Sequence, residues 1–525
     1  MLLLLIVIHP SRERALQRTL RAKAFYERAR ARVENRWAGS GAQGEAWRDP
    51  NHVYADDLDL FGRGSLFELL CTARTATGER TLANWLLAPG EHEQVIERQA
   101  AVRELAVRLD LREDLAVLGD DIRSALDNRR LAAWGARPPV GFFKGARVLA
   151  MVLALAAALA GGAWMFGWTT LRPFFYVAVA EILFVISIRK QIEAVTSSVS
   201  TPARELQLIA LLLDRLERES FSTPALEQLR ARLSAGQRIR SLERLVEWKD
   251  WAHNQIFGVI AAPLLWIPQF AMAIEAWRLE SGPRIADWIA AVGEFEALGS
   301  LAAYAFEHPD AVYPELLTNG DPSYAAVALA HPLIPANEAV ANDVSLDRQT
   351  PLWIISGSNM SGKSTLLRAI GLSVALAWAG APITTRELRL ARLRLGASLR
   401  ANDSLADHRS RFYAEIRKLK DIVDAAGSGQ PVLFLLDELL SGTNSHDRRI
   451  GAEALIRGLL DRGAIGLATT HDLALTEIAE RAPARNVHFE DQFEAGNITW
   501  DYQLRDGVVK RGNALELMRA VGLDV

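Results

Sequence analysis

A glycine-rich phosphate-loop pattern constrains this chain more than any other feature of its sequence. The apolar stretch 352–355 leads into residues 356–365, Ser-Gly-Ser-Asn-Met-Ser-Gly-Lys-Ser-Thr, and helix-forming sequence begins near Leu366. Such glycines let backbone N–H groups close around phosphates, while the following helix points its positive end at them. The pattern therefore predicts a strand, a loop and a helix belonging to an α/β domain with a mostly parallel sheet.

Each residue of this loop has an expected role. Lys363 would reach the outer phosphate oxygens, and the Ser364 hydroxyl would hold Mg²⁺. The other loop residues would surround the phosphates: Gly357, Ser358, Asn359, Met360, Ser361, Gly362 and Thr365.

Two further apolar runs end in polar residues of the kind that such a loop requires. The run 432–436 ends in Asp437 and Glu438, and the run 464–468 is followed by Thr469, Thr470 and His471. Runs of this kind are typical of strands buried on both faces of a parallel sheet. We expect Asp437 to coordinate Mg²⁺ and Glu438 to activate a water molecule. His471 would sense the terminal phosphate.

A helix start at Ser410 completes this set of motifs. A serine hydroxyl at a helix N-terminus suits a phosphate, here one approached from a second subunit. Taken alone, the pair Asp437 and Glu438 could be an acidic cap and His471 could be structural. Their position after a phosphate loop and two buried strands favours the functional interpretation.

A long uncharged segment near the middle predicts a membrane hairpin. Residues 148–168 carry no charge over 21 positions, and a helix of that length matches a hydrocarbon core of about 30 Å. Residues 174–188 form a shorter return run that contains Glu181. Lys and Arg residues flank both outer ends, which favours a cytoplasmic location for those ends. Burial of the hairpin inside a soluble protein is the alternative.

The remaining segments favour helices without evident chemistry. Residues 206–216 show helical apolar spacing typical of a lever, and residues 256–274 are interrupted by Pro263 and Pro268, which favours a buried core helix over a third span. Residues 12–36 hold nine Lys or Arg, either a solvated helix face or a phosphate-binding surface. The net charge of −3 gives no global attraction to nucleic acid. The single cysteine excludes an internal disulfide.

Taken together, these motifs resemble the ATPase domain of the MutS family, a branch of the ABC-type ATPases. The loop is similar to the family's Gly-Pro-Asn-Met-Gly-Gly-Lys-Ser-Thr, and residues 442–447 are similar to its Gly-Thr-Ser-Thr-x-Asp dimer loop. His331 and Pro332 match the pair that opens the domain. The family's signature helix is matched at Asp403, Leu405, Ser410, Phe412 and Glu415.

The resemblance extends upstream to the family's helical core and implies a domain order. It predicts a basic helix (1–50), the first part of the helical core (51–140), the transmembrane hairpin (141–192), the second core or lever part (193–320) and the ATPase domain (321–525). The pattern looks most like membrane-bound bacterial MutS-like proteins. We expect no mismatch-reading wedge ahead of Leu58, and Ala339 stands where the family has an aromatic that stacks on adenine.

The resemblance also implies a function. A homodimer would bind ATP and Mg²⁺ at a composite site, with Lys363, Glu438 and His471 as catalytic residues, and would couple hydrolysis to lever movement. Double-stranded or structured DNA and the lipid bilayer are the expected partners, and the ATPase domain would lie on the cytoplasmic side of the cytoplasmic membrane. A membrane-anchored mechanical ATPase that acts on a non-DNA partner is the alternative.

Overall fold

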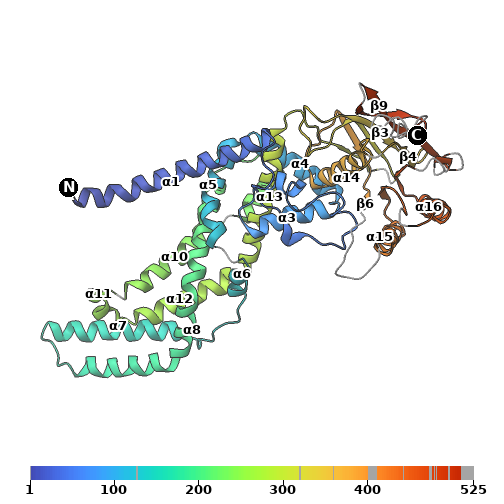
Figure 1. The fold of residues 1–525 in the computed structure, drawn as a ribbon. Coiled ribbons are helices and arrows are strands. Elements are labelled where there is room, and N and C mark those ends of the chain that lie inside the picture. Colours follow the sequence, from blue (N-terminus) through green and yellow to red (C-terminus); the bar gives the residue numbers. More distant parts are fainter. Residues whose placement is uncertain are drawn as a thin grey trace. The chain divides into compact units, whose positions relative to one another are not determined.

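The structure, a computed structural model, combines a helix-rich N-terminal part with a C-terminal α/β part (Figure 1). It describes residues 2–125, 128–233, 235–252, 254–318, 321–358, 360–399, 411–440, 443–471, 476–477, 479, 482–494 and 497–509. This division confirms the fold class expected at the coarse level.

The helices of the described residues are α1 (Leu2–Val33), α2 (Leu66–Leu70), α3 (Ala76–Leu87), α4 (His92–Ala106), α5 (Leu109–Ala125), α6 (Asn128–Gly135), α7 (Ala146–Met165), α8 (Arg172–Glu217), α9 (Pro224–Arg232), α10 (Gly236–Trp251), α11 (Gln255–Ala261), α12 (Trp266–Ser281), α13 (Ile285–Glu307), α14 (Lys363–Ala379), α15 (Arg411–Ala426) and α16 (Ser445–Leu460). The strands are β1 (Glu315–Leu316), β2 (Tyr324–Leu329), β3 (Asn342–Leu346), β4 (Leu352–Ser356), β5 (Glu387–Leu390), β6 (Arg394–Ser398), β7 (Val432–Leu436), β8 (Ile465–Thr470), β9 (Ala484–Glu494) and β10 (Asn497–Asp506).

The chain divides into two compact units. The first unit comprises residues 1–22, 74–78 and 110–296, and the second comprises residues 23–73, 79–109 and 297–525. The helix α13 begins in the first unit and ends in the second.

A hairpin of α7 and the first part of α8 lies in the first unit. Small side chains of α7 are buried at Ala150, Ala154 and Ala157, while Leu155 and Leu159 are 61% and 66% exposed. The helix α7 is apolar and long enough to cross a membrane, with a mean hydropathy of 2.1 and 17% of its span buried. A second stretch, Trp266–Glu307, passes the same test but is 67% buried.

The return segment and the lever form one continuous helix. The helix α8 runs for 46 residues and contains both segments. Both parts bury one side, at Phe184 and Ile188 and then at Leu206 and Leu213. The helix continues between them through Pro202.

The apolar run 256–274 does not form one helix, and that expectation was wrong. It is split between α11 and α12, with Leu265 in the left-handed region at φ 47°. A proline removes a helical hydrogen bond and clashes with the preceding turn, which accounts for the break at Pro263. The helix α12 is largely buried, whereas Ile260 of α11 is 55% exposed.

The basic helix α1 has several of its cations paired within the chain. Arg18 forms an ion pair with Asp114, and Arg32, with only 11% of its side chain exposed, forms one with Glu307. Arg30 and Arg36 both contact Glu34. These pairs leave less free positive charge on the helix than its composition suggests.

The second unit contains a six-stranded sheet in the order β10-β9-β4-β8-β7-β6. Every pairing is parallel except β9 with β10, as expected for a mostly parallel sheet. A four-stranded sheet, ordered β1-β5-β2-β3, was not expected from the sequence.

Helices cover both faces of the six-stranded sheet and fix its central strands. On one face, Phe434 packs in a cluster with Ile422 of α15 and Ile456 of α16. On the other face, Gly371 of α14 lies close to Leu435 and Leu58. All residues of β4, β7 and β8 are buried, which accounts for their continuous apolar sequences.

Candidate functional site

The expected polar residues gather at one edge of the six-stranded sheet. In this sheet β8 lies between β4 and β7, and Ser356 at the end of β4 is in register with Thr470 at the end of β8. Parallel strands place their carboxyl ends at the same edge, where open α/β sheets usually bind ligands. The loop after β4, the acidic pair after β7 and His471 after β8 therefore lie together.

The loop after β4 turns tightly into α14. Gly362 precedes the helix with φ 104°, a conformation that disfavours a side chain, and an added Cβ would lie 3.1 Å from Cδ1 of Tyr502. Ser361 is buried, and its hydroxyl donates to the Ser358 carbonyl at 2.9 Å. Met360 also has a positive φ, and its side chain is 80% exposed.

Lys363 is the buried cation of this loop. Its Nζ donates to the carbonyl oxygens of Gly357 and Ser358 at 2.9 and 2.6 Å. Burial lowers the pKa of Lys363, and the carboxylates of Glu438, Asp437 and Asp491 partly oppose that shift. The amine therefore lies among carboxylates and backbone carbonyls, where it can meet a polyanion.

Asp437 links three elements of the site through its two carboxylate oxygens. Ser364 Oγ on α14 donates to Oδ2 at 2.5 Å, and Thr469 Oγ1 on β8 donates to Oδ1. The same threonine hydroxyl accepts from the Glu438 backbone N–H at 3.1 Å. A hydroxyl and a carboxylate at this distance are the oxygen donors that Mg²⁺ prefers.

Glu438 lies beside His471. Glu438 has a positive φ of 48°, and its Oε1 lies 3.6 Å from His471 Nδ1. Glu415, a buried residue of α15, accepts from the Leu440 backbone N–H at 2.7 Å and holds the turn after Glu438. The strained turn thus places a carboxylate and an imidazole beyond the ends of β7 and β8.

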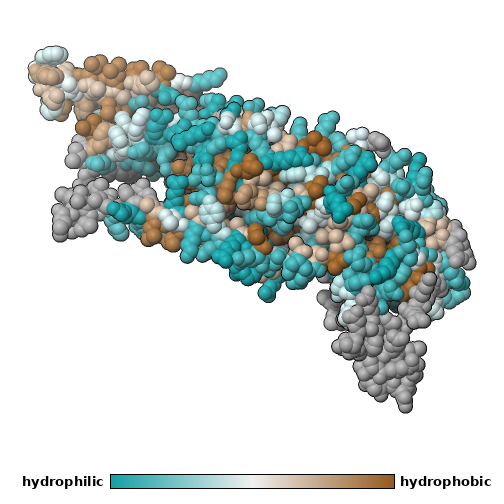
Figure 2. Space-filling view, turned by 90° about the horizontal axis from the view of Figure 1, so that it is seen from above, coloured by the Kyte–Doolittle hydropathy of each residue, from teal (hydrophilic) through white to brown (hydrophobic). Residues whose placement is uncertain are grey.

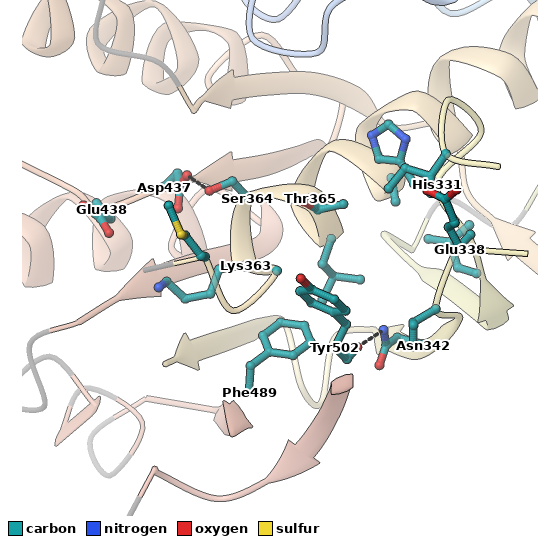
Figure 3. Close-up of a pocket in the computed structure, with 18 residues that line it drawn as sticks. His331, Glu338, Asn342, Lys363, Ser364, Thr365, Asp437, Glu438, Phe489 and Tyr502 are labelled. Carbon is teal, nitrogen blue, oxygen red and sulfur yellow. Dashed lines mark hydrogen bonds between the residues drawn. The ribbon is translucent and has the colours of Figure 1, made fainter. Parts of the chain in front are cut away.

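A cavity of 710 Å³ extends away from this polar cluster. Figure 3 shows Lys363, Ser364, Asp437 and Glu438 on one side and Tyr502, Phe489 and Asn342 further along, with His331 and Glu338 at the opposite side. Thr365 and Ala339 also line the cavity. The site therefore has a charged end and an aromatic end.

An irregularity in β10 places the Tyr502 ring in this cavity. The pairing of β9 and β10 shifts register between Trp500 and Leu504, and Tyr502 has φ 54°. Asn342 at the start of β3 holds this bulge, because its side chain donates to the Tyr502 carbonyl at 3.0 Å and accepts from the Leu504 N–H at 2.7 Å. A bulge of this kind redirects a side chain.

His331 closes the far side of the cavity as a neutral base. Its Nδ1 accepts from the Leu333 N–H at 3.2 Å. Burial and, to a smaller extent, the positive charge of Arg368 lower the pKa of His331 to about 4. The imidazole is therefore uncharged at neutral pH.

Some expected site residues lie outside the described residues. These are Asn359, Ser410, Asp403 and Leu405. The described loop residues Gly357, Ser358, Met360, Ser361, Gly362, Lys363, Ser364 and Thr365 lie at the site with Asp437, Glu438 and His471.

The sequence interpretation missed Phe489, Tyr502 and Asn342 as lining residues. They come from β9, β10 and β3, which no phosphate-loop pattern predicts. Asn342 is a polar residue that is only 8% exposed, and such burial marks it as a candidate site residue. The sequence alone does not show this burial.

Two family models match the chain. MutS domain III matches residues 54–427, and MutS domain V matches residues 353–524, which include the loop, the acidic pair and His471. This chain belongs to the MutS family. The first match covers most of the helical part, and the second covers the six-stranded sheet apart from Leu352, the first residue of β4.

Individual MutS-family relatives match the chain over shorter stretches. An endonuclease MutS2 of Thermus thermophilus is 35% identical over 195 residues, 37% of this chain and 25% of the relative. The DNA mismatch repair protein MutS of Natronomonas pharaonis is 32% identical over 245 residues, 46% of this chain and 28% of the relative. The chain thus spans about a quarter of the length of these curated relatives.

Proposed function

We propose that this MutS-family chain binds ATP with Mg²⁺ and hydrolyses it at the carboxyl edge of the six-stranded sheet. One observation carries the proposal: Ser364 Oγ lies 2.5 Å from Asp437 Oδ2. Ser364 directly follows the phosphate-loop lysine, and Asp437 directly precedes Glu438. A metal-binding pair, a phosphate-binding lysine and a carboxylate free to act on water are the parts that phosphoryl transfer requires.

The roles follow from the positions of the groups. Lys363 and the backbone N–H groups of the loop bind the phosphates, with Ser364 and Asp437 as the Mg²⁺ ligands. Bound Mg²⁺ would neutralise charge on the phosphate oxygens. Glu438 accepts the proton of the attacking water, and His471, 3.6 Å from it, orients that carboxylate and senses the terminal phosphate.

The aromatic end of the cavity suits the adenine base. The segment before the loop offers Ala339 in place of an aromatic, whereas Tyr502 and Phe489 line the same cavity. Because aromatic rings stack on a base regardless of its identity, this end supplies affinity more than selectivity. We infer that β9 and β10 supply the base platform.

We further propose a composite site in a homodimer. Ser410 of a second subunit would approach the terminal phosphate, as the resemblance implies, and residues 321–525 would form the ATPase domain. Residues 51–140 and 193–320 would form the helical core and lever that moves with the nucleotide state, flanking a hairpin at 141–192 and preceded by a basic helix at 1–50. The lever movement would grip or release DNA, either double-stranded or otherwise structured, by analogy with the relatives named for mismatch repair.

A second candidate function is favoured by the α7–α8 hairpin. Large apolar side chains are exposed on both helices, including Val152, Leu155 and Leu159 on α7 and Phe175 and Leu183 on α8. Figure 2 shows hydrophobic surface gathered at the upper left of the view, where this hairpin lies. Apolar surface of this extent suits a bilayer. A membrane-anchored mechanical ATPase acting on a non-DNA partner is therefore the alternative, at the cytoplasmic membrane in either case.

Phosphate release by the purified full chain in detergent, with and without Mg²⁺, tests the proposal. We expect Mg²⁺-dependent ATP hydrolysis that is lost in Lys363→Ala and kept in Lys420→Ala, whose lysine is exposed on α15. Hydrolysis that persists in Lys363→Ala would refute the site. Measuring DNA binding with and without ATP then separates the two candidate functions.

A further inference from the structure

An apolar groove of 590 Å³ lies between α8 and the α11–α12 corner of the first unit. It shares no lining residue with the cavity at the proposed ATP site. Its volume lies within the range of about 300–1,000 Å³ typical of small-molecule pockets.

Among the residues that the structure describes, Glu181 is the only ionisable group that lines the groove. It is 6% exposed, and its Oε1 accepts no hydrogen bond from any residue that the structure describes. The remaining lining residues are apolar or small, among them Ile182, Pro263 and Pro268. The indole N–H of Trp266, which also lines the groove, already donates to the Trp248 carbonyl at 2.5 Å. A buried carboxylate without a donor is costly and points to a missing partner.

The two apolar runs of the hairpin provide no cation for this carboxylate. Residues 148–168 carry no charge, and residues 174–188 carry Glu181 alone. The matching parts of a second hairpin would therefore bring apolar surface and another carboxylate, but no positive group. A lipid acyl chain would fill the apolar space and leave the carboxylate unpaired. The occupant that satisfies both features has an apolar body and one cationic N–H donor.

We propose that this groove binds a lipophilic amine. The protonated nitrogen donates to Glu181 Oε1, and the apolar body lies along Phe174, Ile182 and the Pro263–Pro268 turn. A charge-assisted hydrogen bond supplies orientation, while apolar contact supplies most of the buried surface.

Photocrosslinking of the detergent-solubilised full chain tests the proposal. The probe is dodecylamine with a diazirine in its alkyl chain, and dodecanol with the same diazirine is the matched control. We expect the amine to label peptides containing residues 178–186 and 261–268 about tenfold more than the alcohol does, since charge-assisted bonds exceed neutral ones. Glu181→Gln should reduce amine labelling to the level of the alcohol, and Leu183→Ala, 63% exposed and outside the groove, should leave it unchanged.

A second variant guards against misfolding of the first. Ala178→Phe fills the groove while keeping Glu181, and it should also abolish preferential amine labelling. Equal labelling by both probes, or undiminished amine labelling in Glu181→Gln, would overturn the proposal and leave ordinary lipid contact as the explanation. Labelling spread over Leu155 and Leu159 of α7 would overturn it in the same way. Lys363→Ala should label as the wild type does, so failure here is separate from failure at the ATP site.

Discussion

At the scale of single residues, the Thr469 hydroxyl joins both members of the acidic pair. It donates to Asp437 Oδ1 and accepts from the Glu438 N–H, and the residue is 1% exposed. Valine keeps the shape of threonine and removes both bonds, whereas serine keeps them. A threonine buried beside a carboxylate pair therefore positions that pair without touching substrate.

Thr469→Val should slow ATP hydrolysis about tenfold, since a hydrogen bond of this kind contributes on the order of 1–1.5 kcal/mol. Thr469→Ser should stay within about threefold of the wild type, because its hydroxyl preserves both bonds. Steady-state phosphate release measures both rates. Wild-type turnover in the valine variant, or an equal loss in the serine variant, would remove Thr469 from this positioning role.

His331 makes the stability of the α/β part depend on pH, and the direction of that dependence follows from its lowered pKa. Its folded-state pKa is about 4, below the unfolded value near 6.5, so the unfolded chain binds the proton first as the pH falls. The contribution of the neutral His331 to the free energy of unfolding is fully present above pH ~6.5 and is lost progressively as the pH falls to ~4. It amounts to about 3 kcal/mol. The midpoint temperature of thermal unfolding should therefore fall more steeply from pH 7 to pH 4.5 in the wild type than in His331→Gln. Parallel curves for the two proteins would contradict this.

At the scale of elements, a buried ion pair attaches α15 to the segment before α2. Lys418 contacts Asp57, which is 1% exposed and also accepts from the Leu399 N–H at 2.7 Å. Burial lowers the pKa of Lys418 to about 8. The pair joins residues that are 361 positions apart in the chain.

Lys418→Met should destabilise the second unit by about 3–5 kcal/mol, because it removes the ammonium group that pairs with the buried Asp57 carboxylate. Adding Asp57→Asn to that variant should recover part of the loss. Lys420→Met, two positions along the same helix, breaks only an exposed pair with Asp424 and should leave the stability close to that of the wild type, because water screens such a pair. Thermal unfolding of the three variants compares them. Equal losses of stability in Lys418→Met and Lys420→Met would show that the buried ion pair stabilises the protein no more than the exposed pair does.

The elements also show what the sequence can predict. The strands β4, β7 and β8 could be predicted because each is buried on both faces and each precedes a recognisable polar motif. Tyr502 could not, since its place in the cavity depends on a bulge held by Asn342, 160 positions away. The split of residues 256–274 follows from Pro263, but apolar composition alone favoured one helix.

At the scale of the whole molecule, the exposed hairpin predicts membrane association. The apolar side chains of α7 are mostly exposed, and such a helix is stabilised when it enters a bilayer. The chain should therefore sediment with membranes and resist carbonate extraction.

The orientation of the hairpin can be measured with single cysteines in a Cys71→Ser background. Thr170→Cys, in the turn between α7 and α8, should react with an impermeant thiol reagent on intact cells. Ser428→Cys, exposed after α15, should react only after permeabilisation. Release of the chain by carbonate, or reaction at Thr170 only in permeabilised cells, would refute a spanning hairpin with this orientation.

The central claim is that Glu438 activates water for ATP hydrolysis at the Lys363 and Asp437 site. The most direct measurement is single-turnover phosphate release from Mg²⁺-ATP by Glu438→Gln, paired with nucleotide binding by the same protein. We predict unchanged ATP binding and release slower than the wild type by at least about 100-fold, the lower end of general-base effects. Phosphate release at the wild-type rate with intact binding would contradict the account.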